Sequence, residues 1–240
     1  MASGQDERRA EQDRRSERDR RRGRLATRPT PPTESGPLGL QPLGLGERRD
    51  GLLYIPSGYQ PDRPAPLVVM LHGAGGSAER GIAPLQDVAD AAGSILLAID
   101  SRGRSWDVIL GGYGPDVAFI DHALDRTFAR YAIDPGKLAV EGFSDGASYA
   151  LSLGITNGDL FSHVLAFSPG FCWPGAEIGT PRIFVSHGTS DNVLPIDACS
   201  RKIVPRIQRS GYATRYVEFD GGHTVPPEIV QDALSWFAGD

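Results

Sequence analysis

Short runs of apolar and β-branched residues recur along this chain with helix-like stretches between them, and this alternation limits the possible folds most strongly. The run LVVMLHG (67–73) is continuously apolar through its first five residues, as expected of a strand buried on both faces of a parallel sheet. Strands that alternate with helices predict an α/β domain, with a mostly parallel twisted sheet and helices on both faces. The other predicted strands are 51–56, 94–100, 137–143, 163–169, 182–188 and 214–220.

Two stretches carry apolar residues at steps of three and four, as a helix with one buried face requires. One lies between two predicted strands, over 116–131, and the other follows the last predicted strand. Pro226 and Pro227 precede the second stretch, and proline suits the start of a helix. The apolar positions are Val117, Ile120, Leu124 and Phe128 in the first, and Ile229, Val230, Ala233, Leu234 and Phe237 in the second.

Three reactive side chains follow predicted strands, in the chain order Ser144, Asp191, His223. Parallel sheets place their sites at the carboxyl ends of the strands, so these three groups are expected to meet there. A serine hydroxyl is a weak nucleophile that needs a base, and histidine can take its proton and later return it to the leaving group. A carboxylate on the other ring nitrogen fixes the tautomer. We predict Ser144, His223 and Asp191 as catalytic residues.

The sequence GFSDG around Ser144 predicts a sharp strand-to-helix turn. Such a turn brings the residues two before and two after the serine close together, so side chains there would clash. Gly142 and Gly146 remove this clash. The turn also places Ser144 at a helix N-terminus, where the helix dipole favours developing negative charge.

A glycine-rich loop, HGAGG (72–76), follows the strand-like run LVVML. Acyl transfer needs hydrogen-bond donors for the oxyanion of the tetrahedral intermediate. The backbone N–H of Asp145, the residue after the nucleophile, is one predicted donor. Ala74 in the glycine-rich loop is the second, with Gly75 as its substitute.

Other histidines and aspartates compete for these roles. His187 ends a strand and is expected to be a buried histidine with satisfied hydrogen bonds. Asp197 and Asp220 are less well placed than Asp191, since one falls near the next helix and the other inside the last strand. The remaining histidines, His72, His122 and His163, are expected to have structural or surface positions.

Several residues near the same rim could contact a substrate. They are Gly75, Trp106, Tyr113, Phe171 and Trp173. Each aromatic residue could instead pack a loop onto the core. No long insertion resembles a lid, so we expect an open, small site that suits short-chain or otherwise water-soluble esters.

Five stretches carry a family resemblance: LLYIPSGY, PLVVMLHGAGG, VEGFSDGASYAL, VSHGTSDNVLP and FDGGHTVPPEI. From about residue 47 onward the chain resembles serine esterases of the α/β-hydrolase fold, in the phospholipase/carboxylesterase and polyhydroxybutyrate-depolymerase-like group. The resemblance implies ester hydrolysis without a metal or other cofactor. Asp145 departs from the pattern, since many carboxylesterases have glutamine there. A carboxylate beside the site is expected to disfavour anionic substrates.

The sequence therefore predicts a serine carboxylesterase for small or medium acyl and aryl esters. A lysophospholipase, a polyester depolymerase or a peptidase with the same triad is the alternative. A non-catalytic binding module on a hydrolase scaffold ranks last, because the chain keeps the serine, the acid and the histidine. The expected partner is a small-molecule ester; the sequence leaves the oligomeric state open.

The N-terminal region differs in composition from the rest. Residues 1–28 hold ten arginines against six acidic residues and no aromatic residue, and 29–46 are rich in proline and glycine. We predict that 1–46 form a disordered basic arm with a linker, and that 47–240 form the α/β-hydrolase catalytic domain. A basic arm could touch nucleic acid or acidic lipid, but the composition favours a solvated tail, so no nucleic-acid partner is expected.

Location is predicted from what the sequence lacks. It has no apolar run of eighteen or more residues that would span a membrane, and no signal-peptide pattern at its start. We predict a cytoplasmic protein. Whether Cys172 and Cys199 pair is left open, as two cysteines are a poor guide to compartment.

Overall fold

The computed structural model describes residues 17–19, 22–46, 49–82 and 85–239. Within these residues an eight-stranded sheet has the order β1-β2-β4-β3-β5-β6-β7-β8. β1 and β2 run antiparallel to their neighbours and the other strands are parallel. The strands are β1 Gly39–Pro42, β2 Gly51–Ile55, β3 Ala65–Leu71, β4 Ile95–Ile99, β5 Ile133–Phe143, β6 His163–Phe167, β7 Arg182–Gly188 and β8 Thr214–Phe219.

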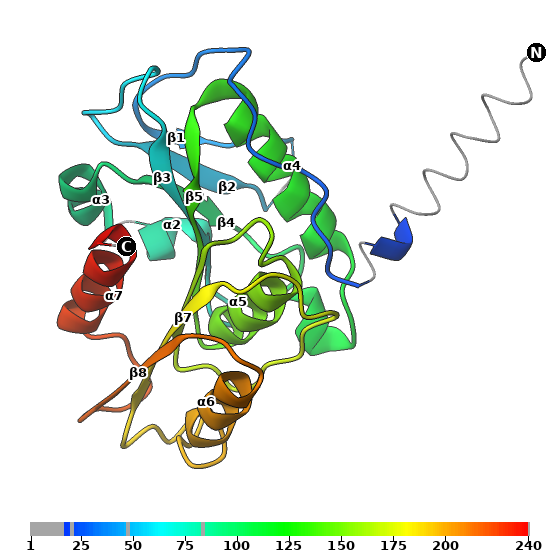
Figure 1. Cartoon of the computed structure of the whole chain (residues 1–240), viewed down its shortest axis with the longest axis vertical. Helices are drawn as coiled ribbons and strands as arrows, with labels where there is room; N and C mark the ends of the chain where they lie inside the picture. Colours follow the sequence, from blue (N-terminus) through cyan, green and yellow to red (C-terminus); the bar gives the residue numbers. More distant parts are fainter. Residues whose placement is uncertain (1–16, 20–21, 47–48, 83–84, 240) are drawn as a thin grey trace, which may run out of the picture.

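Helices cover both faces of this sheet, as Figure 1 shows. One face packs against α4, α5 and α6, and the other against α2, α3 and α7. The helices are α2 Ala78–Ile82, α3 Gln86–Ala92, the 3-10 helix η2 Asp107–Leu110, α4 Pro115–Arg130, α5 Asp145–Thr156, α6 Ser200–Arg209 and α7 Pro227–Gly239. The predicted α/β-hydrolase architecture is confirmed, as are the seven predicted strands and the two predicted helices.

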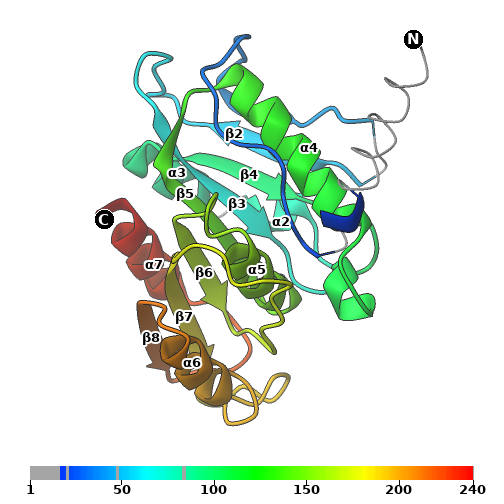
Figure 2. The same ribbon diagram turned by 45° about the vertical axis from the view of Figure 1, so that its right-hand side comes forward.

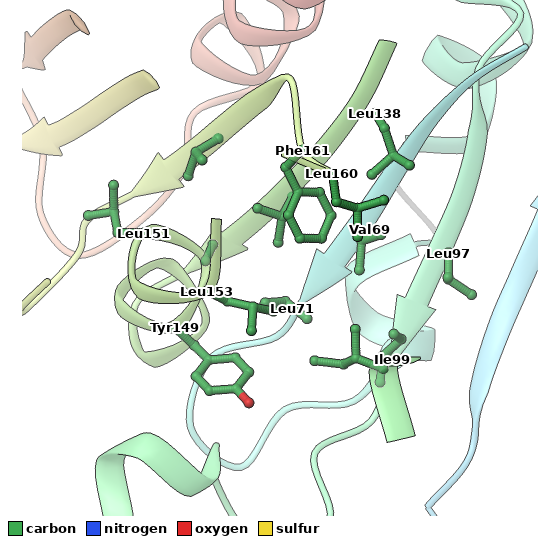
Figure 3. Close-up of a cluster of buried hydrophobic side chains, with 14 of the residues drawn as sticks. Val69, Leu71, Leu97, Ile99, Leu138, Tyr149, Leu151, Leu153, Leu160 and Phe161 are labelled. Atoms are coloured by element: carbon green, nitrogen blue, oxygen red, sulfur yellow. The ribbon is translucent and has the colours of Figure 1, made fainter. Parts of the chain in front are cut away.

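The larger part of the core lies between the sheet and α5 (Figure 3). Val69 and Leu71 of β3 belong to the same core cluster as Leu153 and Tyr149 of α5, and none of these side chains is more than 2% exposed. α5 is buried along almost its whole length. Burial on this scale holds β3, β5 and β6 side by side under one helix (Figure 2), and this helix begins directly after Ser144. The core therefore fixes the position of the predicted nucleophile.

The prediction of a disordered arm and linker is wrong for residues 22–46, which pack on the folded domain. Leu25 is 2% exposed, and its N–H donates to Asn157 Oδ1 at 2.9 Å. Arg24 forms two hydrogen bonds of 2.8 Å with the Asp159 carboxylate. Further along, β1 pairs with β2 at the edge of the sheet. The predicted arm at 1–16 lies outside the described residues.

Two smaller points follow from the described residues. Cys172 and Cys199 are both buried and free, so they do not pair with each other. No helix in the described part of the chain is long and apolar enough to cross a membrane.

Candidate active site

Ser144 occupies the single residue between β5 and α5. Its backbone has φ 57° and ψ −118°, a conformation that non-glycine residues rarely adopt. The Ser144 N–H donates to Phe167 O of β6 at 2.9 Å, and the Ser144 carbonyl accepts from Ser148 N at 3.0 Å in α5. The strained turn is thus held on both sides, and it lifts the hydroxyl above the carboxyl edge of the sheet.

The two glycines that flank Ser144 make this turn possible. A Cβ on Gly142 would collide with the carbonyl group of Gly146. A Cβ on Gly146 would collide with the Leu71 carbonyl oxygen and lie 2.6 Å from His72 O. The close approach expected from GFSDG is present, and Gly146 also lets α5 approach β3.

His223 bridges the serine and the acid. Its Nε2 lies 2.9 Å from Ser144 Oγ, and its Nδ1 lies 2.6 Å from Asp191 Oδ2. The ring also packs on Phe143, with 4.8 Å between ring centroids. The structure therefore brings together the three side chains that the sequence separates by 79 and 32 positions.

The Asp191 carboxylate is buried and fully bonded. Its Oδ1 accepts from the N–H groups of Val193 at 2.9 Å and Leu194 at 2.8 Å, which leaves Oδ2 for His223. Burial raises the pKa of Asp191, but the hydrogen bonds from Leu194, His223 and Val193 outweigh it and hold this pKa below its ordinary value. Asp191 is therefore a carboxylate at neutral pH.

A second histidine lies behind this acid. Nε2 of the fully buried His187 is 2.8 Å from Leu194 O and 3.2 Å from Asp191 Oδ2, and its Nδ1 is 2.7 Å from Ser200 Oγ. A carbonyl oxygen only accepts, so we assign the proton to Nε2 and let Nδ1 accept from the serine hydroxyl. Both ring nitrogens of His187 have hydrogen-bond partners, as expected, and its Nε2–H is a second donor that faces the catalytic carboxylate.

Of the rival aspartates, neither approaches His223. Asp197 has a side chain that is 81% exposed and pairs with Arg201 at 2.9 Å. Asp220 is exposed in the loop after β8.

Hydrogen bonding in the glycine-rich loop distinguishes the two predicted oxyanion donors, Ala74 and Gly75. The Gly75 N–H donates to Arg104 O at 2.8 Å and the Gly76 N–H to Gly73 O at 3.0 Å. Within the described residues, neither the Ala74 N–H nor the Asp145 N–H has a hydrogen-bond partner. Gly75, the alternative donor, is thus already engaged, and Ala74 is the available one.

His72 orients this loop, and none of its hydrogen bonds to the described residues involves the triad. Its Nε2 accepts from the Ser101 N–H at 3.0 Å, so its Nδ1 donates to Gly73 O at 2.6 Å. Burial lowers the pKa of His72, which keeps the ring neutral. The Asp145 carboxylate beside the serine accepts from Ser105 Oγ at 2.5 Å, and this bond ties its side chain to the loop after β4.

The four aromatic residues predicted to contact a substrate differ in their surroundings. The prediction for Trp106 is wrong: its side chain is 0% exposed, donates from Nε1 to His72 O at 2.8 Å and stacks on Tyr149. Phe171 and Trp173 line a separate hollow of about 210 Å³ beside α6. The Tyr113 hydroxyl donates to Trp173 O at 3.0 Å, so it supports that hollow.

A larger cavity, of about 630 Å³, lies on the other face of the sheet. Its lining includes Ala74 and His223, so it reaches the base of the triad, and it also includes Phe143, Phe167 and Glu141. It is larger than the small site expected from the sequence, and neither Gly75 nor any of the four predicted aromatic residues lines it. The sequence does contain one sign of this cavity. Glu141 is a charged residue inside the otherwise mainly apolar run KLAVEGF.

Glu141 gives the chain a testable pH dependence of stability. Burial raises its pKa from 4.5 to about 8. The folded chain keeps this proton over a pH range in which the unfolded chain has lost it, so the free energy of unfolding falls as pH rises through that range. Relative to Glu141→Gln, we expect wild type to lose on the order of 4 to 5 kcal/mol between about pH 4.5 and pH 8. Urea unfolding of both proteins across this range measures the difference, and parallel pH profiles would contradict it.

Comparison with known proteins places this site in a family. No family model matches the chain. It is 30% identical over 221 residues to a probable feruloyl esterase C of Aspergillus oryzae, covering 78% of this chain and 80% of that protein. It is also 30% identical over 146 residues to the putative esterase NocK of Nocardia uniformis, covering 56% of this chain. That match spans only 42% of NocK, less than half of its length.

A solved structure supports the same fold. The crystal structure of esterase PE8 superimposes with a TM-score of 0.65 at 22% sequence identity, over 80% of this chain and 99% of that one. The strand order and the strand-to-helix turn at Ser144 fit the same fold as these relatives. The chain therefore belongs to the esterases of the α/β-hydrolase fold, a family of carboxylic ester hydrolases.

Proposed function

We propose that this protein is a serine carboxylesterase that hydrolyses small or medium acyl and aryl esters through an acyl-enzyme. The observation that carries the proposal is the position of the His223 ring, 2.6 Å from Asp191 and 2.9 Å from Ser144. A neutral imidazole that donates from Nδ1 to a carboxylate presents a lone pair at Nε2 to the hydroxyl. Ser144, His223 and Asp191 then act as nucleophile, base and orienting acid.

In the first step, Ser144 Oγ attacks the ester carbonyl carbon while His223 Nε2 takes the hydroxyl proton. The carbonyl oxygen becomes an oxyanion, and the unpartnered N–H groups of Ala74 and Asp145 are its donors. Loss of one such donor typically costs about 2.7 to 4 kcal/mol of barrier stabilisation. The intermediate collapses as His223 returns the proton to the leaving alcohol.

In the second step, water attacks the acyl-Ser144 ester. His223 takes a proton from this water, the same two N–H groups bind the new oxyanion, and Ser144 leaves with the proton. The buried Asp191 carboxylate stabilises the imidazolium that forms in each step. The Aspergillus relative is called a feruloyl esterase, which supports aryl acyl groups among the substrates.

A panel of p-nitrophenyl esters tests this function. We expect hydrolysis of the acetate, butyrate and octanoate esters by wild type, and covalent labelling of Ser144 by a fluorophosphonate probe. A preference for the palmitate ester would contradict the small or medium acyl range. Labelling at any residue other than Ser144 would contradict the proposed nucleophile.

A further inference from the structure

Glu141 lies in the middle of the sheet, on the strand that carries the nucleophile. Its neighbours in register are Met70 of β3 and Leu165 of β6. Side chains of residues paired in this way lie on the same face of a sheet. Met70 and Leu165 belong to the core on the α2, α3 and α7 face. The Glu141 carboxyl therefore points into the apolar layer between the sheet and these helices.

This carboxyl has no partner among the described residues. Glu141 is only 9% exposed, yet none of them donates a hydrogen bond to it or forms an ion pair with it. A buried polar group without a partner destabilises the fold, and a buried carboxylate does so far more. The neighbouring positions on the same face are apolar, so an apolar residue would fit better for stability alone. A ligand that bonds this group would account for its presence.

The space in front of Glu141 is the cavity of about 630 Å³ that reaches His223. Its wall is mainly apolar, with Met70, Phe143, Phe167 and Val230 among the lining residues. Among the described residues, the other ionisable groups that line it are Arg80, exposed on α2, and His72 and His223 at the loops above the sheet. The cavity thus offers an apolar path that starts at His223, the base of the triad, and contains one buried carboxyl.

The length of this path follows from strand geometry. Three residue steps along the chain lead from Glu141 to Ser144, which is about 10 Å at roughly 3.3 Å per step in a strand. An acyl group attached to Ser144 Oγ would need this length to place a polar atom beside the Glu141 carboxyl. An aliphatic chain of about eight carbons or a phenylpropanoyl group has nearly this reach.

We propose that Glu141 is a specificity-determining residue, and that it hydrogen-bonds a hydroxyl group at the far end of an apolar acyl chain about 10 Å long. The inference rests on the proposed function, because that function places the ester carbonyl at Ser144. Burial raises the pKa of Glu141 to about 8, so the group is a neutral carboxyl that both donates and accepts. A hydroxyl matches both roles without charge, whereas an ammonium group would have to lose its hydration.

Binding without hydrolysis tests this inference separately from the proposed function. Isothermal titration of the Ser144→Ala chain would compare methyl ω-hydroxyoctanoate with methyl octanoate. A second pair would compare methyl para-hydroxyphenylpropanoate with methyl phenylpropanoate. We expect the hydroxyl to tighten binding about tenfold in at least one pair. The pair that responds tells an aliphatic from an aromatic hydroxyacyl group.

Variants at Glu141 assign the effect to this residue. In the same Ser144→Ala background, Glu141→Leu should remove the hydroxyl gain, and Glu141→Gln should keep most of it. Glu141→Met replaces the leucine variant if that protein does not fold. Glu177→Leu, which changes an exposed glutamate outside the cavity, is the matched control and should keep the full gain.

Two results would overturn the inference: no gain from the hydroxyl in either pair, or a gain that survives Glu141→Leu and Glu141→Met. Failure of the proposed function has a different signature. In that case wild type would not hydrolyse p-nitrophenyl acetate, whatever the binding of the hydroxy esters.

Discussion

Replacing Ser144 by alanine is expected to lower kcat for p-nitrophenyl butyrate by roughly 10⁴- to 10⁶-fold, with little change in stability. The side chain loses one oxygen, whose partner is His223 Nε2 at 2.9 Å. Without it there is no covalent intermediate, and the remaining rate comes from the oxyanion donors and substrate binding alone. Alanine at this position keeps the backbone strain of φ 57°, since serine already bears it. Steady-state rates and thermal unfolding of both proteins measure the two effects.

Ser190→Ala is the matched control. Ser190 is exposed in the loop after β7, close in the chain to the catalytic acid. Its backbone N–H donates to Gly221 O, and its hydroxyl bonds none of the described residues. The kcat of the Ser190→Ala variant for p-nitrophenyl butyrate should stay within about twofold of wild type, because most surface substitutions have small effects. Residual activity of Ser144→Ala above about a hundredth of wild type would mean that another group is the nucleophile.

The elements that the sequence predicts well are those whose signal is local. An apolar run bounded by turn residues identifies a buried strand, and the steps between Val117, Ile120, Leu124 and Phe128 identify α4. The triad was predictable for a related reason. Each of its members follows a strand, and parallel strands end at one edge of the sheet. Strand placement alone therefore brings distant residues together.

The N-terminal segment was not predictable from composition. Its contacts are with residues far away in the chain: Arg24 bonds Asp159, and the buried Leu25 bonds Asn157. β1 reads GLQP, a sequence that resembles a linker, because an edge strand tolerates glycine and proline where a central strand does not. Composition describes the average of a segment, and here a few specific contacts decide its structure.

The prediction that Trp106 contacts a substrate was wrong because proximity in the chain to the rim does not determine which way a side chain points. Trp106 follows β4 on the correct rim but turns inward onto Tyr149. In β5 the alternation of faces separates Val140, which packs toward α5, from Glu141 and Phe143, which face the cavity. The sequence shows this alternation, but only the structure shows that the second face is hollow.

Replacing the catalytic acid Asp191 should affect both the base and the loop that follows β7, because the two oxygens of its carboxylate bond different groups. Oδ1 accepts two backbone N–H groups, from Val193 and Leu194, while Oδ2 faces His223 Nδ1 and His187 Nε2. An asparagine amide has one oxygen and one NH₂ group, and N–H donors lie on both sides of this position. In either orientation the NH₂ group therefore faces N–H groups that need an acceptor. With NH₂ toward His223, the ring is driven to the tautomer with its proton on Nε2, which cannot accept from Ser144. With NH₂ toward the loop, two backbone N–H groups lose their acceptor.

Asp191→Asn is therefore expected to lower kcat about 10⁴-fold while KM changes little, since the acid acts on the base and does not touch the substrate.

Because hydrogen bonds hold the pKa of Asp191 below its ordinary value, ionisation of this acid stabilises the fold at neutral pH, and that contribution is lost as pH falls through the lowered pKa. The asparagine variant lacks this acid-dependent loss, so its stability should fall less than that of wild type toward low pH. Asp197→Asn, at an exposed carboxylate in the same loop, is the control and should keep both wild-type kcat and the wild-type acid profile. Rates near wild type in Asp191→Asn would show that His223 does not need this carboxylate, and the assignment of the acid would fail.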